Sequence, residues 1–164
     1  MDKTVINLPR GMISIVGPNG SGKSNILDAI RWVLGEQSVK SLRSEKMQDV
    51  IFAGIQSKSQ LGMCEVSLII DNEDRQIDIE YTELAIKRKT YRNGESQFFI
   101  NGKKCRLKDI RELLLDTGIG KEGYSIISQG RIDEIISSNG YQKRVLLEEA
   151  SGIAKYRYKK EEGE

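Results

Sequence analysis

The order of apolar and polar positions in the first 35 residues predicts a strand, a loop and a helix. Met12–Val16 is a short apolar run that predicts a buried strand ending at Gly17. From Asn25 to Leu34, apolar side chains recur at the spacing of one helix face. Gly35 follows directly and is typical of a helix end, because glycine readily adopts the left-handed backbone found there.

The middle of the chain predicts an antiparallel meander. The strand-like runs are Glu65–Ile70, Gln76–Tyr81, Ala85–Arg92 and Ser96–Ile100. The pairs Asn93-Gly94 and Asn101-Gly102 follow the last two runs. Because asparagine and glycine both tolerate positive φ, such pairs indicate tight hairpin turns between neighbouring strands.

The last third of the chain is mainly helical in pattern. Leu107–Leu115 predicts a helix whose apolar residues lie on one face. The glycines between positions 118 and 123 predict a loop, and from Tyr141 the chain becomes helical and strongly charged. That end is typical of the start of a coiled coil. We therefore expect a globular unit over residues 1–140 and a coiled-coil root over residues 141–164.

The composition is that of a soluble globular protein, with 38% hydrophobic and 30% charged residues. No apolar run approaches the ~20 residues of a membrane-spanning helix, so we expect no membrane contact. Cys64 and Cys105 form no CxxC pair, which favours a reducing, cytoplasmic location. The sequence contains no histidine, which excludes histidine-based general base catalysis and most zinc sites.

Charge is distributed unevenly along the chain, although the net charge is only +2. Between Glu65 and Glu83, seven acidic residues and one basic residue give a net charge of −6. Between Ala85 and Arg111, nine basic and two acidic residues give +7. This asymmetry favours a polyanion as a partner, and the alternative is a strand pair with one solvated face.

The most specific motif is an uninterrupted match to G-x-x-x-x-G-K-[ST], formed by Gly17, Pro18, Asn19, Gly20, Ser21, Gly22, Lys23 and Ser24. Between a strand and a helix, such a loop turns backbone N–H groups toward phosphate oxygens at the positive end of the helix. Lys23 is expected to reach the β- and γ-phosphates, and the Ser24 hydroxyl to bind Mg²⁺. The motif predicts a site for ATP with Mg²⁺, and the alternative is a glycine-rich turn that fits the pattern by chance.

Hydrolysis also needs a carboxylate that orders Mg²⁺ and a base, usually an apolar run followed by Asp-Glu. The nearest candidate is Val66–Asp71, but Asn72 stands where the base is needed and Glu73 comes one position late. Asp71 is therefore either an ordinary strand end or a catalytic carboxylate. The chain holds only half of a hydrolytic site, and we expect no turnover by the chain alone.

Several segments resemble the structural maintenance of chromosomes (SMC) proteins, which belong to the ABC-type ATPase superfamily. They are Gly17–Asn25, Asp28–Ser38, Asp49–Gly54 and Tyr124–Arg131, and the last three are far more specific than the first. Over almost its whole length the chain is similar to the N-terminal half of a bacterial-type SMC head. The resemblance implies an α/β fold, namely an ABC-type P-loop NTPase head lobe with a mixed core sheet, a flanking antiparallel β-meander and the start of a coiled-coil helix.

The resemblance also implies roles for single residues around the nucleotide. Asn25 extends the phosphate loop. Gln129 matches a glutamine that contacts Mg²⁺ and helps to place the attacking water. Arg43 matches an arginine that reaches ATP and assists hydrolysis across two engaged heads, a role that suits its planar, permanently charged guanidinium.

Heads of this family bind double-stranded DNA on the face that forms when two heads close over ATP. Lys46, Arg106 and Lys108 resemble positions on that face, and the stretch of net charge +7 agrees with it. Contacts of this kind are made to phosphates. They are therefore independent of base sequence and weakened by salt.

The family's Leu-Ser-Gly-Gly signature segment, and its Asp-Glu pair after an apolar run, do not occur in this sequence. In the family both come from a C-terminal head half. The resemblance implies that half, a second SMC chain in a homodimer and a kleisin-type subunit as partners. The implied function is ATP-driven DNA binding, chromosome condensation and segregation, in the cytoplasm at the nucleoid. The alternatives are a head lobe of a related DNA-repair ATPase and a small self-sufficient P-loop NTPase.

Overall fold

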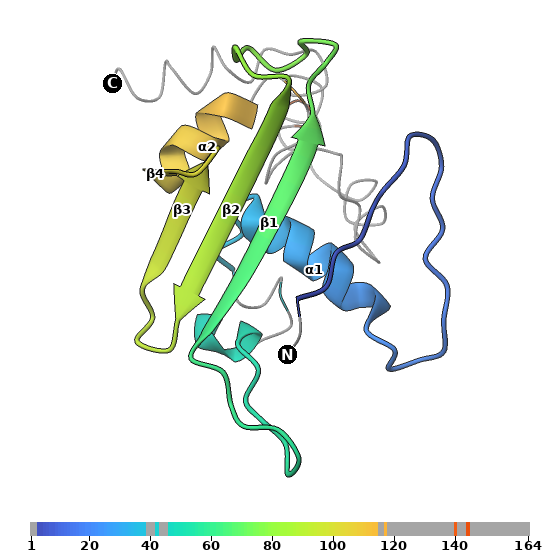
Figure 1. Cartoon of the computed structure of the whole chain (residues 1–164), viewed down its shortest axis with the longest axis vertical. Helices are drawn as coiled ribbons and strands as arrows, with labels where there is room; N and C mark the ends of the chain where they lie inside the picture. Colours follow the sequence, from blue (N-terminus) through green and yellow to red (C-terminus); the bar gives the residue numbers. More distant parts are fainter. Residues whose placement is uncertain are drawn as a thin grey trace.

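The computed structural model describes residues 3–38, 42, 46–114, 117, 140 and 144. The elements in chain order are α1 (Lys23–Val33), the 3₁₀-helix η2 (Met47–Val50), β1 (Met63–Asp71), β2 (Glu83–Tyr91), β3 (Ser96–Ile100), β4 (Lys103–Cys105) and α2 (Leu107–Leu114). Figure 1 shows the strands as one sheet, with α1 crossing behind β1 and β2 and α2 beside the β3 edge, and residues of both helices join the core. Most of the coiled-coil root predicted over residues 141–164 lies outside the described residues, so that domain boundary stays a prediction.

The strands form one antiparallel sheet in the order β1-β2-β3-β4, which confirms the predicted meander. β1 and β2 pair along all nine residues of each strand. The predicted hairpin turns are also confirmed, because Gly94 has a φ of +88° between β2 and β3. Between β3 and β4, Asn101 and Gly102 have φ values of +46° and +80°. Positive φ at both central residues is the turn geometry that matches the twist of a hairpin.

The strand predicted at Gln76–Tyr81 does not form, so that prediction is wrong. Asn72 is only 2% exposed, and its side chain accepts a hydrogen bond from the Ile77 amide and donates to the carbonyls of Ile77 and Tyr81. The Arg75 guanidinium donates to two further carbonyls of the segment. Side chains therefore satisfy backbone groups that a strand ladder would otherwise pair, and the segment becomes the connection between β1 and β2.

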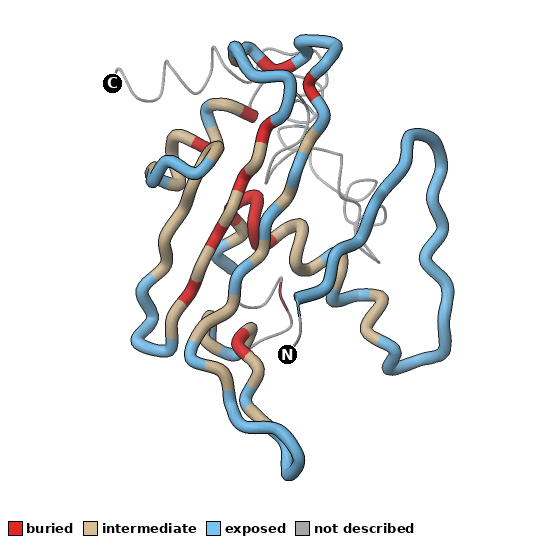
Figure 2. Tube along the Cα trace, viewed as in Figure 1, coloured by how far each residue is buried: buried red, intermediate tan, exposed pale blue. Residues whose placement is uncertain are grey.

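The core lies between the inner face of the sheet and the two helices. Alternate residues of β2 are buried, as the period of a strand requires, and Figure 2 shows them as a row along that strand. The fully buried apolar cluster consists of Val33, Leu34, Ile77, Leu84, Ile86, Ile110 and Leu114. Since α1 contributes only residues near its C-terminal end to this cluster, the core holds that end of the helix.

The strand predicted at Met12–Val16 is also absent, and residues 3–22 contain no strand. Met12 is fully exposed and Val16 is 87% exposed. A core strand needs neighbours on its hydrogen-bonding edges, and none of β1 to β4 pairs with this segment. Without such neighbours the apolar run stays in water, and irregular chain leads into the phosphate loop.

The predicted end of α1 at Gly35 is confirmed, and the geometry shows why glycine stands there. The Gly35 amide donates to the Trp32 carbonyl at 3.2 Å, and the Glu36 amide donates to the Arg31 carbonyl at 3.0 Å. With φ of +108° at Gly35, these bonds form the Schellman arrangement. A Cβ at position 35 would lie 2.6 Å from Cδ1 of Leu107, so α2 approaches the end of α1 very closely.

Candidate nucleotide-binding site

The predicted phosphate loop lies directly before α1, with Gly22 as the residue that caps the helix. Gly20 and Gly22 adopt φ values of +83° and +87°, which side chains other than glycine rarely accept. The Asn25 amide donates to the Gly22 carbonyl at 3.0 Å and starts the helical turn. The loop therefore has the helix-start geometry that the motif predicts, although the strand expected before it does not form.

Lys23 folds back over its own loop. Its Nζ donates to the carbonyl oxygens of Gly17 and Pro18 at 2.6 Å and 2.7 Å. The Ser21 side chain lies against Gly17, where a Cβ would come within 2.9 Å of the Ser21 Oγ. Phosphate oxygens are charged and accept stronger hydrogen bonds than neutral carbonyls do. Phosphate oxygens of a nucleotide would have to displace these two carbonyls to bind the Lys23 ammonium.

Ser24 and Asn25 are exposed in the first turn of α1. The first N–H groups of a helix have no acceptor within the helix, and the helix dipole favours an anion at this end. Within the described ranges, no three Asp, Glu or Cys side chains form a group that would hold a metal ion. A Mg²⁺ ion at Ser24 would therefore take further ligands from the phosphate oxygens of a bound nucleotide.

Asp71, the candidate carboxylate, is the last residue of β1 and binds Arg10 at 2.8 Å. The hydrogen bond from Arg10 lowers the pKa of Asp71, and a second hydrogen bond from the Glu73 amide adds to the effect. These contacts tie the N-terminal segment to the end of the sheet. They favour the interpretation of Asp71 as an ordinary strand end.

The basic stretch between Ala85 and Arg111 is not one surface. Lys87 and Lys89 lie on the outer face of β2 and bind Glu65 of β1 at 3.2 Å and 2.9 Å. Arg88 lies between them on the inner face and is 3% exposed. Burial lowers the pKa of Arg88 to about 10, so the guanidinium stays charged at neutral pH. This part of the stretch agrees with the alternative of a strand pair with one solvated face.

The charge pattern alone does not indicate that Arg88 is buried against the far end of α1. A local signal does exist, because Arg88 shares its strand parity with the apolar residues Leu84 and Ile86. That parity places the guanidinium in the core beside α1, where it contacts the end of the helix that follows the phosphate loop.

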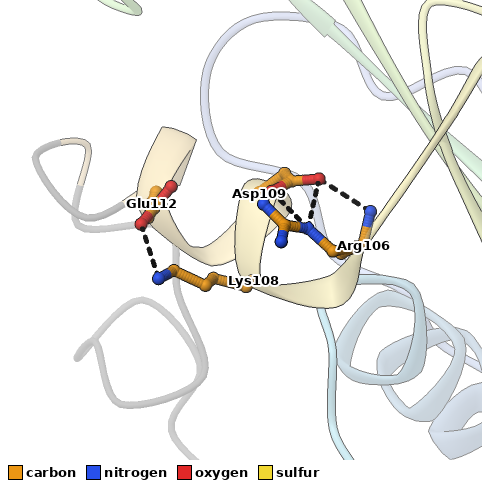
Figure 3. A network of polar contacts seen from close by, with 4 residues as sticks. All are labelled: Arg106, Lys108, Asp109 and Glu112. Atoms are coloured by element: carbon orange, nitrogen blue, oxygen red, sulfur yellow. Dashed lines mark hydrogen bonds and ion pairs between the residues drawn. The ribbon is translucent and has the colours of Figure 1, made fainter. Parts of the chain in front are cut away.

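The candidate DNA residues Arg106 and Lys108 lie together at the start of α2, and each binds a carboxylate of the same helix (Figure 3). Arg106 Nη2 lies 2.9 Å from Asp109, and Lys108 Nζ lies 3.7 Å from Glu112. The Asp109 carboxylate also accepts the Arg106 amide at 2.8 Å, which caps the helix. Hydrogen bonds from Arg106 lower the pKa of Asp109, so both groups are charged at neutral pH. A DNA phosphate would have to compete with these carboxylates.

The candidate DNA residues sit next to residues that contact the end of α1. Lys46 precedes η2, whose first residue Met47 accepts a hydrogen bond from Trp32 Nε1 at 3.3 Å. Leu107, between Arg106 and Lys108, packs on Gly35. The basic residues thus come from two separate elements, η2 and α2, and both elements pack around the same end of the helix.

Arg43 and Gln129 lie outside the described residues, so their roles stay predictions. In the part of the chain that the structure describes, no helix is long and apolar enough to cross a lipid bilayer.

Comparison with known proteins identifies the family of this chain. Residues 1–142 match the family described as the RecF/RecN/SMC N-terminal domain. The chain is 59% identical to a chromosome partition protein Smc of Clostridium kluyveri and 51% identical to one of Bacillus subtilis, each over 99% of its length. It spans about 14% of the length of these curated relatives.

Solved structures agree with the sequence relatives. A chain studied for ATP-driven dimerization and DNA-stimulated activation of SMC ATPases is 37% identical, with a TM-score of 0.78 over 88% of this chain and 87% of that chain. An Smc head from Pyrococcus furiosus, bound to the C-terminal domain of ScpA, is 39% identical, with a TM-score of 0.78 over 88% of this chain and 36% of that chain. These likenesses confirm the predicted ABC-type head lobe, and the chain belongs to the RecF/RecN/SMC N-terminal domain family as the N-terminal part of an SMC head.

Proposed function

We propose that this chain is the ATP-binding part of an SMC head that drives DNA binding, chromosome condensation and segregation in the cytoplasm at the nucleoid. The observation that carries the proposal is an uninterrupted phosphate loop at the start of α1, in a chain whose relatives are chromosome partition proteins. Those relatives favour chromosome segregation over the alternative of a DNA-repair head.

The chain's own residues divide the work at the nucleotide. Lys23 leaves the carbonyls of its loop and binds the β- and γ-phosphates, while the loop amides bind the remaining phosphate oxygens. The Ser24 hydroxyl would hold Mg²⁺, which would supply positive charge against the transferred phosphoryl group. Gln129 would help to hold the ion and orient the attacking water, and Arg43 would stabilise charge across two engaged heads.

Hydrolysis requires parts that this sequence does not contain. A C-terminal head half supplies the signature segment and the Asp-Glu pair, and a second SMC chain closes over the nucleotide. A kleisin-type subunit is the further proposed partner, since the Pyrococcus furiosus head is described as bound to a domain of ScpA. Within the described residues Asp71 binds Arg10, which supports the view that the missing carboxylates come from elsewhere.

The proposal is tested by adding the C-terminal head half of the Clostridium kluyveri relative as a separate chain. We expect negligible ATP hydrolysis by this chain alone, and turnover that appears only when both chains are mixed. Robust hydrolysis by this chain alone would contradict the proposal and favour a small self-sufficient P-loop NTPase. A mixture that forms a complex but never hydrolyses ATP would also contradict it.

We further propose that Arg106 and Lys108 at the start of α2, together with Lys46, bind the phosphates of double-stranded DNA. The exposed Arg106 side chain and the location of both residues on one helix end support a contact to adjacent phosphates. Phosphate binding of this type does not depend on base sequence.

The double variant Arg106→Glu/Lys108→Glu is expected to weaken duplex binding by the assembled head about tenfold or more at low salt. Loss of phosphate contacts also flattens the dependence of affinity on salt concentration. Fluorescence anisotropy with labelled duplexes measures both quantities, and ATP affinity should not change. Lys3→Glu/Lys58→Glu, at two other exposed positions, changes the net charge equally and is the matched control for added negative charge. If affinity and salt slope stay at wild-type values, the proposed DNA contact is wrong.

The variant Asp109→Asn is expected to raise duplex affinity a few-fold, because it removes the carboxylate that binds the Arg106 guanidinium. Asparagine keeps an oxygen that caps the start of α2, so the helix should persist. The same anisotropy titration checks the result, with Glu112→Gln as the parallel change beside Lys108. An unchanged affinity for both variants would show that these ion pairs do not compete with DNA.

A further inference from the structure

The Arg88 guanidinium is enclosed by groups from α1 and β3. Its carbon Cζ lies 4.6 Å from the centre of the Trp32 ring and 5.0 Å from the centre of the Phe98 ring. Its Nη1 donates to the carbonyl oxygens of Trp32 and Glu36, both at 2.8 Å. One side chain of the meander therefore joins two aromatic rings and two backbone carbonyls.

The Trp32 carbonyl belongs to the last turn of α1, and the Glu36 carbonyl belongs to the segment that directly follows the helix end at Gly35. This end also carries the negative pole of the helix dipole, which a cation stabilises. Arginine suits the position because its flat guanidinium stacks on rings while its N–H groups reach two acceptors, and a lysine ammonium cannot do both. Arg88 thus fastens the end of α1 to the inner face of the sheet.

The phosphate loop lies at the opposite end of the same helix. α1 has 11 residues, so the two ends are about 16 Å apart. Its buried residues are Trp32 and Val33, both in the last turn, while Lys23 and Ser24 at the first turn are not buried. Because residues 3–22 form no strand, the phosphate loop connects to the sheet through the Arg10–Asp71 ion pair on one side and through α1 on the other. The orientation of the loop therefore depends in part on how the far end of α1 is held.

The buried guanidinium is not optimised for stability alone. The Arg88 Nε is buried without a hydrogen-bond partner among the described residues, and an unsatisfied buried donor costs free energy. An apolar side chain of similar size would fill the same space without that cost. What the Arg88 guanidinium contributes instead is a fixed orientation for the C-terminal end of α1.

We propose that Arg88 is a positioning residue for nucleotide binding, which sets the orientation of α1 and thereby of the phosphate-loop amides at its other end. This inference rests on the proposed nucleotide site. By linkage, if removing the Arg88 side chain weakens ATP binding, its contacts must stabilise the ATP-bound chain more than the free chain. The contacts of Arg88 with Trp32 therefore tighten on ATP binding.

The sequence offers a built-in probe, because Trp32 is the only tryptophan and lies against the Arg88 guanidinium. We expect Mg·ATP to change the tryptophan emission of the wild-type chain, and Lys23→Ala to abolish that change. No change in emission while calorimetry shows saturating ATP binding would overturn the inference. This measurement needs no variant at Arg88 and holds even if such variants fold poorly.

Calorimetric titration of the full 164-residue chain with Mg·ATP supplies the second test, at a temperature where circular dichroism shows every variant folded. Arg88→Lys and Arg88→Met should raise the dissociation constant about tenfold. The matched control is Thr90→Val, which removes the hydrogen bond between Thr90 of β2 and Ser96 of β3, two positions along the strand from Arg88. It should lower the melting temperature yet leave the dissociation constant within about twofold.

The outcomes separate the two proposals. Wild-type affinity in both Arg88 variants, or an equal loss in Thr90→Val, overturns the positioning role and leaves the nucleotide site standing. A folded wild-type chain that binds no ATP overturns the nucleotide site and the positioning role together.

Discussion

Replacing Lys23 with alanine is expected to abolish detectable ATP binding, with a loss of at least about a hundredfold in affinity. The variant removes the ammonium that now binds the carbonyls of Gly17 and Pro18 and that fits the β- and γ-phosphates of a nucleotide. Charge-assisted hydrogen bonds to buried phosphate oxygens are worth about 1.5–3 kcal/mol each, and Lys23 supplies more than one. Calorimetric titration with Mg·ATP measures the effect, and Lys23→Ile should behave in the same way.

The matched control is Lys3→Ala, which removes one positive charge from an exposed residue far along the chain from the loop. It should leave the affinity for ATP at the wild-type value. If Lys23→Ala also binds ATP with wild-type affinity, the assignment of the phosphate loop is wrong.

Replacing Gly35 with alanine is expected to reduce the free energy of unfolding by about 2–5 kcal/mol. The left-handed backbone at φ of +108° costs a residue with a Cβ about 1–2 kcal/mol, and a Cβ here would also lie 2.6 Å from Leu107 Cδ1. Forcing an extra carbon into a packed contact typically costs a further ~1–3 kcal/mol. Urea denaturation followed by circular dichroism measures the change.

Gly102→Ala separates the two causes, because Gly102 has a φ of +80° but no atom within 4 Å of the added Cβ. It should show only the backbone cost, and thus a smaller loss of stability than Gly35→Ala. Equal losses for the two variants would mean that α2 does not approach the end of α1 as closely as the structure shows.

Elements that depend on local sequence were predictable. The two Asn-Gly turns fix the hairpins of the meander, since Gly94, Asn101 and Gly102 adopt the positive φ values that these turns need. The spacing of apolar residues likewise fixes α1 and α2. Gln76–Tyr81 has an alternating pattern but no strand, because the side chain of Asn72, just before the segment, takes its backbone hydrogen bonds. Such a competitor is not visible in the alternation itself.

The Met12–Val16 segment illustrates a second limit. Its apolar composition suits a core strand, but a strand forms only beside partners, and the described residues include none that pair with it. The curated relatives are far longer than this chain, and their additional length offers room for such partners. Sequence pattern thus indicates a preference for a strand, while the rest of the assembly decides whether it forms.

In the candidate site, too, features set by contiguous residues were predictable and features set by distant contacts were not. The phosphate loop was predictable because all of its residues are contiguous and their types carry the chemistry. Arg88 was not, because its importance arises from Trp32 and Glu36, which lie more than fifty positions earlier in the chain. Net charge over a stretch did not reveal that Arg88 is buried between rings.

The central claim is that the backbone amides between residues 17 and 24, completed by an ammonium and a hydroxyl, bind a triphosphate. Amide chemical shifts recorded by NMR during a titration with Mg·ATP test it most directly. The account predicts saturable shift changes that are largest for the Gly17–Ser24 amides, with smaller changes at the far end of α1. Saturable binding whose largest changes lie elsewhere, or loop amides that do not respond to millimolar Mg·ATP, would contradict it.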